Sequence, residues 1–71
     1  MTNAERCIFY FAKCKTDEDN YQFLQWVTEN SKDVNHRNIN CEPRFSIITF
    51  NDDSKVKLEI KKNLIINITI L

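Results

Sequence analysis

Hydrophobic and polar residues alternate with a period of two through the C-terminal part of the chain, which is typical of strands with one buried face. Three runs follow this pattern: residues 45–50, 55–61 and 64–71. Only residues 51–54, with a predicted turn at 51–53, and residues 62–63 separate the runs. Connections this short join neighbouring antiparallel strands, so we predict a three-stranded meander.

The second connection also predicts a register. A loop formed by residues 61–63, with Asn63 in a left-handed conformation, would place Leu64 opposite Ile60 and join the apolar faces of the two strands. The chain contains no glycine, so turns that need a positive φ have to be made by Asn or Asp.

Residues 6–15 are rich in aromatic and apolar side chains, which are typical of strands. In an extended conformation Cys7, Phe9 and Phe11 would lie on one face, and the intervening Ile8 and Tyr10 on the other. Since both faces are apolar, we predict a strand that is covered on both sides or faces a partner.

Residues 16–19, Thr-Asp-Glu-Asp, have the composition of a helix N-terminus. Thr16 is the expected N-cap, and the three acidic residues after it suit the positive end of the helix dipole. We expect the helix to continue to about Lys32, with Phe23 and Val27 at the centre of its apolar stripe. Residues 33–43 have no sustained period, and we predict an ordered loop that could hold a brief strand.

The predicted fold class is therefore α+β with the order β-α-β-β-β. It consists of a four-stranded, mostly antiparallel sheet with one helix packed on one face. Residues 1–71 form a single small domain, because a chain of this length buries only about 60% of the surface of its unfolded form.

One helix covers only part of one face of four strands, so we expect an association site on the uncovered face. The period does not decide whether Phe45 and Ile47 or Ile48 and Phe50 contribute to that face. The remaining residues of the predicted sheet-face interface are Ile8, Tyr10, Lys55, Lys57, Lys61 and Ile65. The last strand is the most hydrophobic, and its edge requires a partner or a cover. We therefore expect a homodimer or a complex with a larger protein.

The amino-acid composition narrows the possible partners and the possible location of the protein. Ten Lys and Arg balance ten Asp and Glu, which argues against a protein held to nucleic acid or to a membrane mainly by its global field. No apolar run is long enough to span a membrane, and three cysteines, an odd number, favour a reducing cytoplasm over a secreted disulfide framework. Abundant Ile, Asn and Lys suggest AT-rich coding DNA, which is compatible with an AT-rich bacterium, a phage or another mobile element, or some eukaryotes and viruses.

Candidate chemistry is sparse. His36 and Cys41 share a loop, but no third orienting group or oxyanion-hole motif accompanies them, so we predict no catalytic residues and no enzyme. In the predicted strand Cys7 and Cys14 would lie on opposite faces about 23 Å apart, too far to share a metal ion. We therefore expect no metal site and no cofactor.

Charge is distributed unevenly along the chain. Residues 16–35 contain five acidic residues and one lysine, a net charge of −4, whereas lysines gather on residues 55–62. Our leading hypothesis is a non-enzymatic inhibitor or adaptor that binds a larger protein, such as a host-defence or regulatory protein. It would bind through the uncovered sheet face or an acidic partner-binding set of residues: Asp17, Glu18, Asp19, Tyr21 and Trp26. The alternatives are a small nucleic-acid-binding regulator that uses the lysine-bearing sheet face and a plain homodimeric structural domain.

Overall fold

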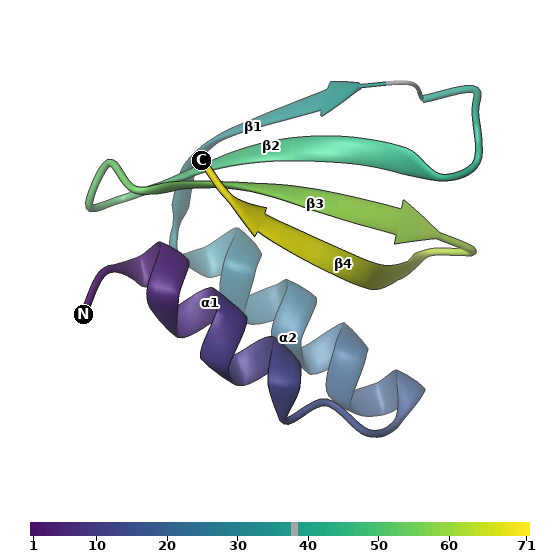
Figure 1. The fold of residues 1–71 in the computed structure, drawn as a ribbon, viewed down its shortest axis with the longest axis horizontal. Helices are drawn as coiled ribbons and strands as arrows, with labels where there is room; N and C mark the ends of the chain where they lie inside the picture. Colours follow the sequence, from purple (N-terminus) through teal and green to yellow (C-terminus); the bar gives the residue numbers. More distant parts are fainter. Residues whose placement is uncertain (38) are drawn as a thin grey trace.

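The computed structural model describes residues 1–37 and 39–71, so Asn38, in the predicted loop, lies outside the described residues. The elements are α1 (Asn3–Ala12), α2 (Asp17–Glu29), β1 (Ser31–Arg37), β2 (Arg44–Phe50), β3 (Lys55–Lys61) and β4 (Leu64–Ile70). The strands form one antiparallel sheet in the order β1-β2-β3-β4, and both helices pack on the same side of it (Figure 1). We call this side the inner face and the opposite side the outer face.

The α+β class, the four-stranded antiparallel sheet and the three-stranded meander are confirmed, but the order β-α-β-β-β is wrong. The first element is a helix, so the sheet carries two helices on one face and not one. The fourth strand is β1, which forms within and just before the segment predicted as a loop.

Residues 6–15 fold mainly as α1 because signals for a helix surround them. Thr2 and Glu5 form a capping box, in which the Glu5 N–H donates to Thr2 Oγ1 (3.1 Å) and the Thr2 N–H donates to Glu5 Oε1 (3.0 Å). Ala4 and Cys7 are buried and Phe11 packs beside them, a spacing that suits one face of a helix. The capping box and the burial of this face against the sheet outweigh the β propensity of the segment.

The start of α1 is anchored on the turn between β2 and β3. The Asn3 N–H donates to Asp52 Oδ2 (2.8 Å), and the Ala4 N–H donates to Ser54 Oγ (3.0 Å). These bonds satisfy N–H groups that have no partner inside the helix. The Asp52 carboxylate also accepts bonds from Ser54, and this hydrogen bonding lowers its pKa.

Helix α2 begins as predicted, with Thr16 as N-cap and with Phe23 and Val27 buried. It ends at Glu29 and not near Lys32. Asn30 terminates it, since its side-chain amide donates back to the Trp26 carbonyl at 2.8 Å and the chain then enters β1 at Ser31.

The hydrophobic core lies between the helices and the inner face of the sheet. On β2, Ser46, Ile48 and Phe50 point inward and are buried, which settles the choice that the alternation left open. Phe45 and Ile47 lie on the outer face and are half-buried. The remaining core residues come from both helices and the last two strands: Ala4, Cys7, Phe23, Val27, Val56, Leu58, Ile60 and Ile65.

The β3–β4 connection has only two residues, Lys62 (φ 55°) and Asn63 (φ 64°), both left-handed. The left-handed Asn63 is confirmed, but Ile60 pairs with Ile65 and not with Leu64, which pairs with Lys61. A β-bulge in the ladder restores the alternation further along, where Leu58 pairs with Ile68. The bulge turns Ile65 toward the helices, so its side chain is buried in the core and not on the uncovered face.

Candidate functional site

The helices cover the two halves of the inner face unequally. Both α1 and α2 pack on β4, and Figure 1 shows them beyond the β4 side of the sheet, away from β1. An open groove of about 350 Å³ therefore runs between α2 and the inner face of β1 and β2. We call it the α2–sheet groove. Its apolar lining comes from α2, β1, β2 and β3: Leu24, Val27, Val34, Ile48, Leu58 and Ile60.

Core residues form the floor of this groove. Val27 and Leu58 are almost fully buried, whereas Val34 at the outer wall is 41% exposed. The groove is thus continuous with the hydrophobic core, and one more apolar layer would complete the burial of the inner face.

The polar residues of the α2–sheet groove carry no negative charge. His36 Nδ1 and Ser46 Oγ lie 2.8 Å apart, which satisfies the buried Ser46 hydroxyl. The Arg44 guanidinium also borders the groove and donates to Asn63 Oδ1 (3.1 Å). Among the described residues that line the groove, Arg44 is charged and none is Asp or Glu, so this end of the groove favours an acidic group on a ligand.

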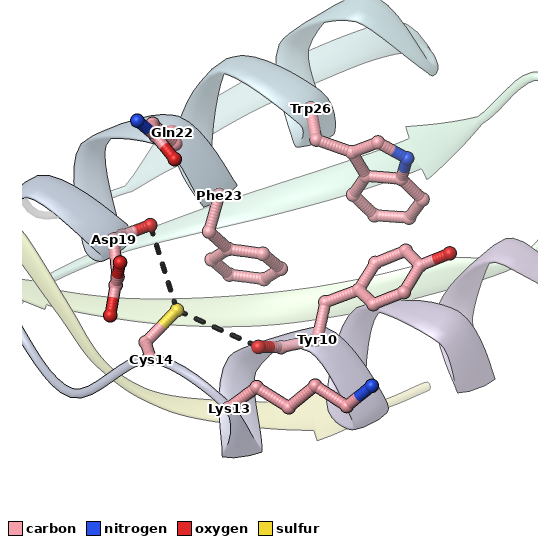
Figure 2. A pocket seen from close by; sticks show the side chains of 7 residues that line it. All are labelled: Tyr10, Lys13, Cys14, Asp19, Gln22, Phe23 and Trp26. Carbon is pink, nitrogen blue, oxygen red and sulfur yellow. Dashed lines mark hydrogen bonds between the residues drawn. The ribbon is translucent and has the colours of Figure 1, made fainter.

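A second hollow, of about 320 Å³, lies between the two helices (Figure 2). Tyr10 of α1 meets Trp26 of α2 edge to face, with ring centroids 5.0 Å apart, and Phe23 lies beside them. The Cys14 thiol contacts the carbonyl oxygens of Tyr10 (3.6 Å) and Asp19 (3.7 Å). Partial burial and the Asp19 charge raise the Cys14 pKa, so this sulfur is held as a thiol and is a poor nucleophile.

The acidic partner-binding set does not form one surface. Asp19 caps its own helix, because its carboxylate accepts from the N–H groups of Lys15 (3.0 Å) and Thr16 (3.3 Å), which lowers its pKa. Asp17 and Glu18 are exposed. Tyr21 and Trp26 lie about 140° apart around α2, so Trp26 faces α1 while Tyr21, 55% exposed, lies on another flank.

The predicted sheet-face interface is also divided. Lys55, Lys57 and Lys61 lie on the outer face as expected, whereas Ile8 and Tyr10 belong to α1. Ile65 is 3% exposed on the inner face. Three residues of the predicted interface, Ile8, Tyr10 and Ile65, therefore do not lie on the outer face, where the half-buried Phe45 and Ile47 lie beside the lysines.

A cation–π contact lies on the outer face of the sheet. The Lys57 ammonium lies 5.2 Å from the centroid of the Phe45 ring. The register also places Arg37 beside Phe45 and Lys57 beside Ile47. Arg37 and Lys57 thus border a partly exposed aromatic and apolar strip, although the acidic Glu59 is the β3 residue that pairs directly with Phe45.

The cysteines are free and differ in environment: Cys7 is buried and Cys41 is exposed. Burial raises the pKa of Cys7 to about 12, which makes it a neutral core side chain. Across residues 1–37 and 39–71, His, Cys, Asp and Glu side chains do not gather in groups of three or more that could hold a metal ion. The helices of this described part are too short or too polar to cross a membrane.

No protein-family model matches this sequence, and neither a curated protein nor a solved structure shows significant similarity to it. The candidate sites therefore stand on geometry alone. Sequence reasoning missed Val34, His36 and Arg44 as groove residues. The signal that was present is the alternation of Val34 and His36 with polar neighbours in the segment predicted as a loop.

Proposed function

We propose that this chain is a non-enzymatic protein-binding module, a small inhibitor or adaptor that docks on a larger protein through the α2–sheet groove. The observation that carries this proposal is an apolar groove of about 350 Å³ that opens directly onto the core. Concave apolar surface with few polar groups is typical of ligand and peptide sites.

The shape and charge of the groove favour an amphipathic segment with an acidic residue. A helix or extended segment of a partner could lay its apolar face along Val34 and Ile48 and direct a carboxylate toward Arg44. We propose this groove as the binding surface in place of the acidic start of α2, because the Asp19 carboxylate already accepts hydrogen bonds from the N–H groups of Lys15 and Thr16. A host-defence or regulatory protein remains the kind of partner that we propose.

Photo-crosslinking in an extract of the source organism tests this proposal. A benzoylphenylalanine replaces Val34 in the groove, and the control carries it at Asn35, an exposed residue of the same strand whose side chain lies on the outer face. We expect one discrete adduct from position 34 only, competed by excess unlabelled protein but not by the Val34→Arg variant. Equal adducts from both positions, or no adduct from position 34, would overturn the proposal.

Nucleic-acid binding on the outer face is the second candidate function. It is favoured by Arg37, Lys55, Lys57 and Lys61 sharing a face with the partly exposed Phe45 ring. Binding of single-stranded RNA or DNA should weaken steeply with salt and should be lost in Lys57→Glu/Lys61→Glu. Asp17→Lys/Glu18→Lys, on the opposite side of the molecule, is the matched control. Salt-independent or unmeasurable binding would exclude this candidate.

A further inference from the structure

We propose that β4 pairs with the β4 strand of a second copy of this chain, joining two sheets into one continuous eight-stranded sheet. This surface is separate from the α2–sheet groove, and the inference does not depend on the proposed function. It rests on the hydrogen bonding, charge and symmetry of the free edge of β4.

The free edge of β4 has backbone groups without hydrogen-bond partners among the described residues. The Leu71 N–H donates to the Lys55 carbonyl (3.0 Å), so Leu71 and Thr69 direct their backbone groups toward β3. Because directions alternate along an antiparallel strand, the N–H and C=O groups of Ile68 and Ile70 point away from the sheet. No described backbone group outside the strand ladders bonds to them. They are a ready template for another strand.

A side chain of α2 already covers the start of the β4 edge. After the bulge, Ile65 directs its backbone away from β3, and the buried Asn20 side chain pairs with it in both directions. Asn20 Nδ2 donates to the Ile65 carbonyl (3.0 Å), and the Ile65 N–H donates to Asn20 Oδ1 (3.1 Å). Asn20 therefore acts as a short substitute for a neighbouring strand at the start of β4. The open part of the edge begins beyond it.

The two edges of the sheet differ in charge. The β1 edge, Ser31–Arg37, contains Lys32, Asp33 and Arg37, and charge of this kind protects an edge from pairing. The β4 strand contains no charged residue. Ile66, Ile70 and Ile8 are exposed by 45%, 50% and 37%, so apolar side chains are present along β4 and on α1, which packs against it.

Self-pairing follows from the symmetry of these groups. An antiparallel pair centred on Thr69 places Ile68 opposite Ile70 of the second copy and Ile70 opposite its Ile68. All outward groups of both residues then form hydrogen bonds, and the two Thr69 side chains meet on the outer face, a favourable cross-strand pair. The isoleucine side chains gather on the inner face. A net charge of zero imposes no global repulsion between copies.

Sedimentation velocity over micromolar to millimolar chain concentration tests this inference. We expect the mass to rise from 8.5 kDa toward twice that value with concentration. Ile70→Pro removes an outward N–H without removing a bond to β3, whereas Ile70→Ala loses the same side chain but keeps the donor. Dimerisation should be at least tenfold weaker in Ile70→Pro than in Ile70→Ala. Val34→Pro, which removes an outward N–H on the β1 edge, is the matched control and should dimerise like the wild type.

Hydrogen exchange gives a second readout that a folding defect does not imitate. The amides of Ile68 and Ile70 should become more protected as chain concentration rises, while the exposed amide of Val34 should not. A monomer at all concentrations, equal dimerisation of the two Ile70 variants, or loss of the dimer in Val34→Pro would overturn the proposal. Each outcome is independent of crosslinking through the groove.

Discussion

Replacing Asn20 by alanine should destabilise this protein more than any other substitution of a polar residue in α2. The Asn20 side chain is 8% exposed, and its amide forms both a donor and an acceptor bond with the backbone of Ile65, itself 3% exposed. Alanine removes both bonds and leaves the Ile65 N–H and C=O without partners at a buried position.

The expected cost is large relative to the total stability. A buried polar group left without a partner costs about 1–3 kcal/mol, so at about 1–2 kcal/mol for each of the two groups we expect a loss of about 2–4 kcal/mol. A domain of 71 residues has a free energy of unfolding of roughly 4–11 kcal/mol at about 0.05–0.15 kcal/mol per residue. Since about 1 kcal/mol changes the Tm of a small domain by about 4–8 °C, the Tm should fall by roughly 8–32 °C.

Urea unfolding followed by Trp26 fluorescence measures this loss, because Trp26 packs between Phe23 and Phe50. Gln22→Ala, an exposed position on the same helix, is the control and should change stability by less than about 0.5 kcal/mol. Asn20→Asp can replace both bonds only when its carboxyl is protonated, because the neutral acid donates to the Ile65 carbonyl and accepts from the Ile65 N–H, so this variant should lose stability as the pH rises through the carboxyl pKa. A loss below about 0.5 kcal/mol in Asn20→Ala, with an unchanged m-value, would refute the role assigned to these bonds.

Three further predictions concern caps, pH and thiols. Thr16→Ala should cost about 1 kcal/mol through loss of the α2 N-cap, measured by urea unfolding, and an unchanged midpoint would contradict the capping box. Hydrogen bonding lowers the pKa of Glu5, Asp19 and Asp52 from the ordinary pKa values of 4.5, 3.8 and 3.8. The stabilisation that these carboxylates provide is therefore present above the ordinary pKa values, and it is lost as the pH falls through the lowered ones. Thermal unfolding on acidification should show this decline, and Asp52→Asn should flatten it; an equally steep decline in the variant would argue against Asp52. Iodoacetamide labelling followed by mass spectrometry should modify Cys41 first, Cys14 more slowly and Cys7 only on unfolding, and early modification of Cys7 would contradict its burial.

The sequence allowed the meander and α2 to be predicted because their signals are local and agree with one another. Period-two alternation, short turns and the Thr16 cap each point to one structure. Residues 6–15 carry conflicting signals, because their aromatic residues favour a strand whereas the Thr2–Glu5 capping box just before them favours a helix. The strand β1 is polar and almost fully exposed, and Val34 is its one hydrophobic residue, so its alternation is too weak to predict a strand before pairing with β2 is known.

The candidate site could not be predicted because it depends on where the helices sit over the sheet. The groove exists since α1 and α2 lie toward β4, and no property of Val34 or Arg44 alone indicates that position. The β4 edge was more accessible to prediction, because the absence of charge on residues 64–71 is visible in the sequence. The role of Asn20 was not, since its partner Ile65 lies 45 residues away and reaches it only through the bulge.

The turns of this glycine-free chain have a consequence for the order of folding. Asp53, Lys62 and Asn63 adopt positive φ, and a left-handed conformation costs a residue such as Lys62 about 1–2 kcal/mol, whereas Asp and Asn tolerate it better. The β3–β4 turn therefore favours its hairpin less than a turn with glycine would, whereas each helix begins with a complete capping box that needs only neighbouring residues. We expect the helices to acquire structure first and to provide the surface on which the strands assemble, so that closing the sheet is the slow step of folding.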